Sequence, residues 1–153
     1  MISRSLPRGE PIIILLVEDN PAHAELILRN FETHQLANQI IHLSDGAQAL
    51  DYVFRRGAYA DPSQSPRPHL ILLDLRLPKV DGLEVLQAIK EAPELQAIPV
   101  VVLTTSEAEQ DAFQAYQHRV NSYLVKPVDF HKFTKLMEEL EFYWLVWNYY
   151  PWT

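Results

Sequence analysis

Three short, uninterrupted apolar runs limit the folds open to this chain more than any other feature. They are IIILLV at 12–17, HLILLDL at 69–75 and IPVVVLT at 98–104, and all are rich in branched side chains. Apolar character without alternation is typical of strands covered on both faces, as in parallel sheets. Two weaker candidates, 38–43 and 121–125, bring the predicted strands to five.

Helix signals separate these predicted strands. A helix-starting signal follows each predicted strand. These signals are Asn20-Pro21, Asp45, Asp81-Gly82, Ser106 with Glu109 as a capping box, and Asp129. Alternating buried strands and helices predict an α/β protein, a (βα)5 fold with a doubly wound, flavodoxin-like, parallel five-stranded sheet. Residues 57–68 contain three prolines and no apolar periodicity, so we expect a long loop there.

Composition narrows the class of protein. A chain of 153 residues fits a single domain, and its formal charge of −7 argues against sequence-independent nucleic-acid binding and against binding an anionic membrane surface. It has no cysteine, which excludes disulfides and thiolate metal sites. No stretch reaches 18 apolar residues, and the short run after Arg4 and Arg8 leads into Glu18-Asp19 rather than a cleavage site. We therefore expect a cytoplasmic protein.

Polar side chains stand where the predicted strands end. In open α/β sheets, ligands bind beyond the carboxyl ends of the strands, near the point where the strand order reverses. Three crowded carboxylates there would need a cation, and oxygen ligands without histidine or cysteine favour Mg2+ or Mn2+. An ammonium and a hydroxyl could then contact a phosphate, so this edge is predicted to support phosphoryl chemistry. The residues concerned are Glu18, Asp19, Asp74, Thr104, Thr105 and Lys126.

Each of these residues alone has a simpler explanation. Glu18-Asp19 could be solvated acids at a strand end, Thr104 an ordinary β-branched strand residue and Lys126 a surface lysine. Asp74, with Pro78 behind it, could form a turn. Their joint placement at successive strand ends favours a functional site. The six histidines, by contrast, show no metal-ligand spacing.

The order and spacing of four motifs resemble the receiver domain of two-component response regulators. The motifs are VEDNP, LLDLRLP-K-VDG, P-VVVLTTS and Y-LVKP. The resemblance implies a receiver domain over 11–147, with an N-terminal extension over 1–10 and a tail over 148–153. It also implies that Asp74 accepts a phosphoryl group from the phosphohistidine of a sensor histidine kinase.

The same resemblance assigns the other site residues. Glu18, Asp19, Asp74 and the backbone carbonyl of Arg76 would hold Mg2+, for which Mn2+ could substitute. Lys126, joined to Pro127 by a cis bond, would pair with the phosphoryl oxygens, and Thr104 would bond to the phosphoryl group. Tyr123 would be the switch aromatic that moves inward afterwards. Thr105 occupies a position that is commonly smaller in the family.

A finer resemblance is to the phytochrome-associated response regulators of cyanobacteria and other bacteria. It rests on the long loop before LILLDLRLP, the VVLTTS string and the aromatic C-terminus. The alternative functions are a receiver-like interaction module and a phosphate sink in a phosphorelay. A Mg2+-dependent phosphohydrolase is disfavoured because Arg76 stands where such enzymes usually carry a second acid. The chain is therefore expected to be a signalling switch that catalyses only its own phosphorylation and slow dephosphorylation.

The last predicted helix carries more apolar surface than one small domain can bury. Its stripe is followed by further apolar residues on the other faces, and such a surplus indicates a contact surface. We expect a homodimer through the fourth helix, fifth strand, fifth helix and aromatic C-terminus, and a downstream protein that the sequence does not identify. A helix end folded over the core is the alternative. The residues concerned are Phe133, Leu136, Met137, Leu140, Phe142, Tyr143, Trp144, Leu145, Val146 and Trp147.

Overall fold

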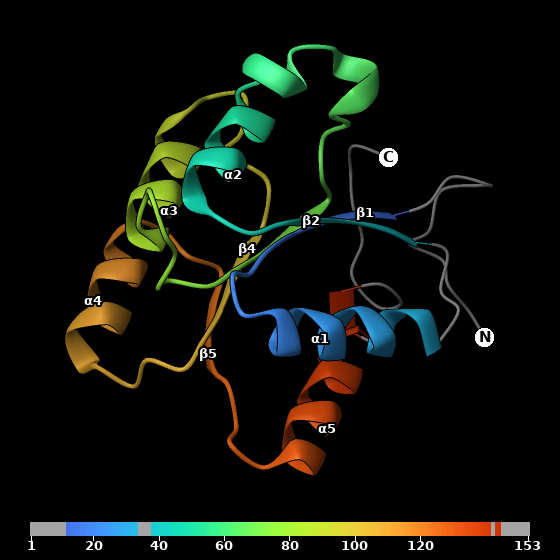
Figure 1. Ribbon diagram of the computed structural model, residues 1–153. Helices are drawn as coiled ribbons and strands as arrows, with labels where there is room; N and C mark the ends of the chain where they lie inside the picture. The colour runs from blue at the N-terminus through green and yellow to red at the C-terminus, as the bar shows by residue number, and fades with distance from the viewer. Residues whose placement is uncertain (1–11, 34–37, 142, 145–153) are drawn as a thin grey trace.

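The computed structural model of the protein describes residues 12–33, 38–141 and 143–144 (Figure 1). Within these residues, five strands alternate with five α-helices, and two short 3-10 helices, Gly57–Tyr59 and Pro62–Gln64, lie in the long loop. The elements are β1 (Ile12–Val17), α1 (Pro21–Thr33), β2 (Asn38–Leu43), α2 (Gly46–Val53), β3 (Leu70–Leu73), α3 (Gly82–Glu91), β4 (Val100–Thr104), α4 (Glu109–Gln117), β5 (Ser122–Val125) and α5 (Phe130–Glu141).

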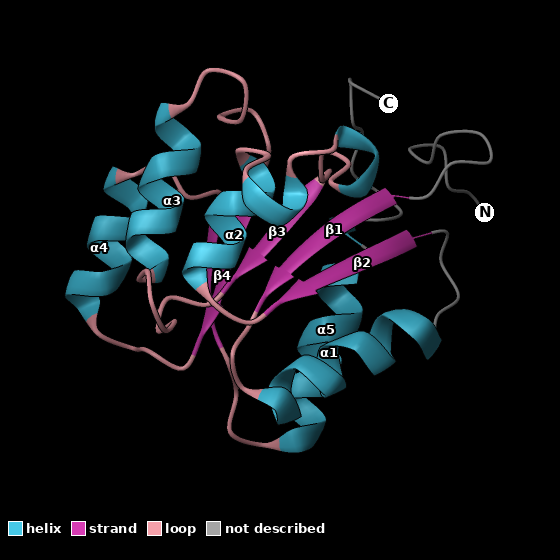
Figure 2. Cartoon of the chain, turned by 45° about the horizontal axis from the view of Figure 1, so that its top comes forward, coloured by secondary structure: helices cyan, strands magenta, loops and turns pink. Residues whose placement is uncertain are grey.

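The strands form one parallel sheet in the order β2-β1-β3-β4-β5 (Figure 2). The chain starts at β1, moves to the β2 edge, and then returns past β1 to add β3, β4 and β5. The order therefore reverses between β1 and β3, which confirms the predicted doubly wound sheet. Loops that leave the carboxyl ends of β1 and β3 run in opposite directions, and this opens a crevice beside those two ends.

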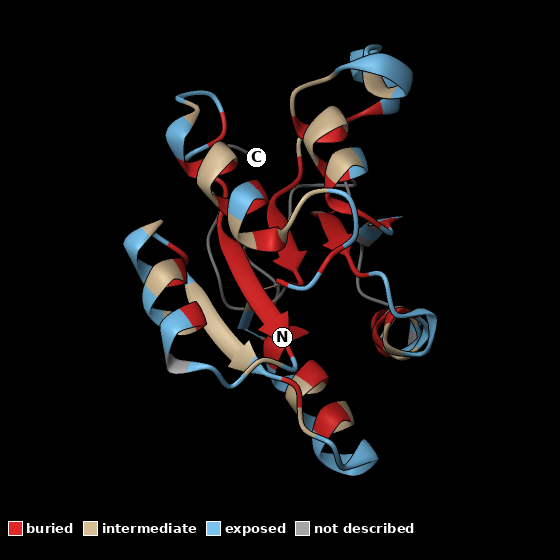
Figure 3. Cartoon of the chain, turned by 60° about the vertical axis from the view of Figure 1, so that its left-hand side comes forward, coloured by how far each residue is buried: buried red, intermediate tan, exposed pale blue. Residues whose placement is uncertain are grey.

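Two layers of helices cover the sheet, because successive strand residues point to opposite faces. In β1, Leu15 and Val17 pack with α2, α3 and α4, whereas Ile14 and Leu16 pack with α1 and α5. This explains why β1, β3 and β4 are apolar and buried at nearly every position, while β5 at the edge is only partly buried (Figure 3).

Most of the predicted helix starts are confirmed. The Asn20 side chain accepts from Ala22 N–H and His23 N–H, Asp45 accepts from Gln48 N–H, Asp81 from Leu83 N–H and Asp129 from Lys132 N–H. The capping box that begins at Ser106 is wrong. Helix α4 starts later, after Ala108, which makes no side-chain cap bond, and the Ser106 hydroxyl donates to Asp111 instead.

Part of what the sequence predicts lies outside the described residues. This holds for the extension over 1–10, the tail over 148–153 and, within the aromatic stretch, residues 142 and 145–147. The bounds of 11–147 for the domain therefore stay a prediction. Among the residues that are described, no helix is long and apolar enough to span a membrane.

Candidate phosphoacceptor and metal site

Asp74 lies directly after β3, at the carboxyl edge of the sheet. Its backbone N–H donates to the Val17 carbonyl at 3.1 Å, which extends the pairing of β3 with β1. The side chain is buried, with Oδ1 accepting from Arg76 N–H at 3.2 Å and Oδ2 accepting from the Lys126 ammonium at 3.1 Å. A carboxylate buried after such an apolar strand needs partners of this kind, because an isolated buried charge is very costly.

Glu18 and Asp19 follow β1 and form an acidic cluster with Asp74. One oxygen from each carboxylate lies within 4.8 Å of the others; Glu18 and Asp74 are buried, and Asp19 is exposed. Burial raises the pKa of Glu18 from 4.5 to about 7, although Lys126 acts in the opposite direction. Three carboxylates near one ammonium leave surplus negative charge, and oxygen-only ligands suit Mg2+ or Mn2+. The cluster can therefore hold a divalent cation.

Lys126 enters the cluster from the end of β5. Its backbone N–H donates to the Thr104 carbonyl at 2.7 Å, and its side chain is only 2% exposed. The ammonium donates to Glu18 Oε1 at 2.5 Å, to His23 Nδ1 at 3.0 Å and to Asp74 Oδ2 at 3.1 Å. The cis bond expected before Pro127 is wrong, because the described residues contain no cis peptide bond. The trans form is also the ordinary preference, by about 0.5–1 kcal/mol for a bond to proline.

Thr104 and Tyr123 both contact the loop between β4 and α4. The fully buried Thr104 hydroxyl accepts from Ser106 N–H at 3.3 Å. The Tyr123 hydroxyl donates to the Ser106 carbonyl at 3.0 Å, and its ring packs against the core beneath α3 and α4. Burial raises the pKa of Tyr123, so the phenol stays a protonated donor. Thr104, predicted to bond to the phosphoryl group, and Tyr123, the predicted switch aromatic, thus contact the same loop, and their response to a phosphoryl group stays a prediction.

Helix α3 begins in direct contact with the backbone of Asp74 and Leu75, just after β3. Gly82 N–H donates to the Leu75 carbonyl at 2.8 Å. A Cβ at Gly82 would lie 2.3 Å from the Asp74 carbonyl oxygen and 2.5 Å from Leu75 Cα. Glycine at this position is therefore a packing requirement of the site, because it lets the helix start against the backbone that carries Asp74.

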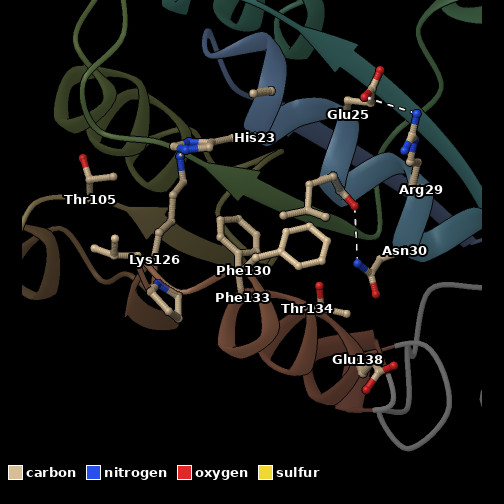
Figure 4. Close-up of a pocket in the computed structure, with 14 residues that line it drawn as sticks. His23, Glu25, Arg29, Asn30, Thr105, Lys126, Phe130, Phe133, Thr134 and Glu138 are labelled. Atoms are coloured by element: carbon tan, nitrogen blue, oxygen red, sulfur yellow. Dashed lines mark hydrogen bonds and ion pairs between the residues drawn. The ribbon is translucent and has the colours of Figure 1, made fainter.

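Two contacts at the site were not predicted from the sequence. His23, in the first turn of α1, reaches the Lys126 ammonium, as Figure 4 shows. On the other side, the Arg76 guanidinium donates to Asp111 Oδ2 in α4, and the Ser106 hydroxyl donates to the same oxygen at 2.6 Å. His23 could have been suspected because it lies in the first turn of α1, three residues after the N-cap Asn20 at the carboxyl edge of the sheet, whereas Asp111 carries no local signal. The backbone carbonyl of Arg76 stays a predicted metal ligand.

A groove of about 700 Å³ adjoins the site between α1 and α5 (Figure 4). His23, Thr105 and Lys126 lie at its inner end, while Phe130 and Phe133 of α5 form part of its wall. Glu25 and Arg29, paired at 3.4 Å, line it on α1. One end of the groove therefore lies beside residues of the site, His23 and Lys126 among them.

Comparison with known proteins agrees with this geometry. The sequence matches the response regulator receiver domain over residues 14–138. The probable methanogenesis regulatory protein FilR2 of Methanothrix harundinacea is 51% identical over 146 residues, which cover 95% of this chain and 92% of FilR2. Response regulator Rcp1 of Synechocystis sp. is 44% identical over 135 residues, which cover 88% of this chain and 90% of Rcp1.

Solved structures give the same result. The Mn2+-bound form of response regulator Rcp1 matches with a TM-score of 0.87 and 43% identity, covering 92% of this chain and 99% of that one. The phosphorylated cyanobacterial phytochrome response regulator RcpA matches with a TM-score of 0.87 and 40% identity, over the same shares. These likenesses confirm the flavodoxin-like receiver fold, and the Mn2+ in Rcp1 agrees with the cation that the acidic cluster fits. The chain belongs to the response regulator receiver domain family.

Proposed function

We propose that this chain accepts a phosphoryl group on Asp74 from a sensor histidine kinase and signals through the resulting change in conformation. The observation that carries the proposal is the buried Asp74 carboxylate, held by Lys126 beside the acids Glu18 and Asp19. In the transfer, an Asp74 oxygen bonds to phosphorus as the P–N bond of the donor phosphohistidine breaks. The electron pair of that bond leaves with the imidazole, and the product is an aspartyl phosphate.

The chain's own residues would prepare this transfer mainly by charge and position. A divalent cation held by Glu18, Asp19, Asp74 and the Arg76 carbonyl would neutralise charge on the transferring group. Lys126, already bonded to Asp74, would donate to a phosphoryl oxygen. The Thr104 hydroxyl, which now accepts from Ser106 N–H, would turn away from it and donate to a second phosphoryl oxygen.

Switching would follow from the same contacts. Movement of Thr104 toward the phosphoryl group alters the β4–α4 loop, and Tyr123 loses the Ser106 carbonyl that holds its hydroxyl. Arg76 offers no general acid for rapid hydrolysis, which supports a signalling switch that catalyses only its own phosphorylation and slow dephosphorylation. A receiver-like interaction module, or a phosphate sink in a phosphorelay, is the alternative function.

For the input, we propose a phytochrome-type histidine kinase, on the strength of the similarity to Rcp1 and RcpA. FilR2, another relative, is named as a probable methanogenesis regulatory protein and not as a phytochrome response regulator. A phytochrome pathway and a FilR2-like pathway would differ in the kinase that transfers the phosphoryl group to this chain. We place the reaction in the cytoplasm, with no nucleic-acid or membrane partner.

For the output, we propose a homodimer through α4, β5, α5 and the aromatic C-terminus. Phe113 and Tyr116 on α4 are 62% and 56% exposed, and Val125 on the edge strand β5 is 39% exposed. Exposed aromatic residues beside an unpaired strand edge are features of protein interfaces.

Light scattering of the wild type and of Tyr116→Glu tests the proposed homodimer. We expect dimers in the wild type that the substitution weakens, and monomers alone at micromolar concentration would contradict the dimer.

Phosphotransfer from purified, autophosphorylated kinases tests the main proposal. A phytochrome-type kinase and an unrelated histidine kinase should both be loaded with labelled phosphate and mixed with wild type and with Asp74→Asn. We expect rapid transfer from the phytochrome-type kinase to the wild type and none to the variant. Equal transfer to Asp74→Asn would contradict the assignment of the acceptor, and faster transfer from the unrelated kinase would contradict the assignment of the input.

A further inference from the structure

All three protons of the Lys126 ammonium have acceptors, and one acceptor differs in kind from the others. Glu18 and Asp74 accept as carboxylates, at 2.5 Å and 3.1 Å. The third acceptor is the imidazole Nδ1 of His23, at 3.0 Å. An ammonium has no lone pair and can only donate, so Nδ1 must be unprotonated, with the ring proton on Nε2. His23 therefore acts here as a neutral ring.

The His23 ring is held in place from several directions. Its backbone N–H donates to the Asn20 side chain at 3.2 Å, which fixes the first turn of α1. Its ring lies 5.8 Å, centroid to centroid, from that of Phe133 in α5. Burial, followed by the nearby ammonium, lowers the pKa of His23, which favours the neutral form that accepts from Lys126. The imidazole is thus preorganised at the inner end of the groove in Figure 4.

A neutral acceptor has a different effect on the ammonium than a carboxylate does. A carboxylate partner cancels much of the positive charge that a phosphoryl group needs, whereas an imidazole fixes the direction of the N–H bonds and leaves the charge available. If the carboxylates of Glu18 and Asp74 were engaged in holding a cation, the imidazole of His23 would be the partner left to hold Lys126 Nζ.

We infer that His23 is a positioning residue for phosphoryl transfer, which holds the Lys126 ammonium beside Asp74 through its neutral Nδ1. This inference rests on the proposed function, because it gives Lys126 a phosphoryl group to contact. It gives helix α1, through His23, a role in the site that is separate from the cation binding assigned to Glu18 and Asp19 at the end of β1. The effect acts through Lys126, so it should appear with a small phosphodonor that needs no protein docking.

Three substitutions separate the parts of this inference. His23→Ala removes the acceptor, His23→Asn places a neutral oxygen where Nδ1 lies, and His23→Asp places a charged oxygen at the same point. The rate of phosphorylation by acetyl phosphate at saturating Mg2+ is measured by intact mass, and the thermal midpoint establishes folding. We expect His23→Ala to be about tenfold slower, a factor equivalent to roughly 1.4 kcal/mol. We expect His23→Asn to stay within about twofold of wild type and His23→Asp to be at least as slow as His23→Ala.

Three results would overturn the inference: an unchanged rate in folded His23→Ala, a His23→Asn variant as slow as His23→Ala, or a His23→Asp variant as fast as His23→Asn. A second readout does not depend on phosphorylation. Nitrogen-15 NMR of the wild type, assigned with His23→Asn, should give a neutral ring protonated at Nε2, and a ring protonated at Nδ1 would refute the contact. A wild type that takes no phosphoryl group but keeps this signature would overturn the proposed function and leave the Lys126 contact standing.

Discussion

Replacing Gly82 by alanine should damage both the stability and the cation affinity of this protein. The added Cβ would lie 2.3 Å from the Asp74 carbonyl oxygen, 2.5 Å from Leu75 Cα and 2.9 Å from the Leu75 carbonyl oxygen. All three are backbone atoms, so no side chain can turn aside. Ordinary contact begins near 3.4 Å, which means that α3 and the loop that carries Asp74 and Leu75 must separate by about 1 Å.

The cost can be worked from that overlap. Overpacking typically destabilises by about 1–3 kcal/mol, and three backbone overlaps point to the upper end. Alanine returns up to about 1 kcal/mol of helix propensity, so the net loss is about 2 kcal/mol. At about 2–4 °C per kcal/mol for a chain of this size, the thermal midpoint should fall by about 4–8 °C. Because the loop carries Asp74 and the Arg76 carbonyl, we also expect Mg2+ to bind about tenfold more weakly.

Calorimetry measures both effects, with Gly57→Ala as the control. Gly57 has a φ of +57°, and its nearest atom would lie 3.8 Å from a new Cβ, so alanine there is strained without colliding. That control should lose about 1 kcal/mol of stability and keep the Mg2+ affinity of the wild type. If Gly82→Ala kept both the midpoint and the affinity of the wild type, the argument that α3 must start against this loop would be refuted.

Two further predictions concern charged groups around the site. Without a metal, the raised pKa of Glu18 makes its contribution to stability complete below pH 4.5 and lost as the pH rises through about 7. Urea unfolding in EDTA should therefore show wild type losing on the order of 3 kcal/mol relative to Glu18→Gln between pH 4.5 and 8, and a pH-independent difference would contradict the shift. Asp111→Asn should break the ion pair with Arg76 and weaken the hydrogen bond from Ser106. The free energy of unfolding should fall by only about 1 kcal/mol, because the Arg76 side chain is 55% exposed and solvent screens the pair. Hydrogen exchange at residues 106–112 should become faster, and unchanged exchange there would argue against this link.

The strands and most helix starts could be predicted from the sequence because their causes are local. The runs at 12–17 and 38–43 match β1 and β2 residue for residue, since apolar runs and turn residues set those bounds. The capping box at Ser106 failed because another local contact formed instead: the Ser106 hydroxyl donates to the side chain of Asp111, five residues on, and α4 starts only after Ala108.

The candidate site divides in the same way. The acids at the ends of β1 and β3 could be placed together because parallel strands end at one edge of the sheet. The contact of His23 with Lys126 joins residues 103 positions apart through side-chain rotamers, and that of Arg76 with Asp111 joins residues 35 positions apart. No sequence motif predicts either of these long-range contacts. The bond before Pro127 depends on its tertiary environment, and there the expected isomer was wrong.

Intact mass after incubation with acetyl phosphate and Mg2+ tests the central claim most directly. The wild type should be compared with Asp74→Asn, with an EDTA control, and with Asp81→Asn as an acid substituted outside the cluster. We predict the gain of one phosphoryl group in the wild type and in Asp81→Asn, and no gain in Asp74→Asn or in EDTA. An undiminished gain in Asp74→Asn, or no gain in the folded wild type, would contradict the claim that Asp74 is the phosphoacceptor.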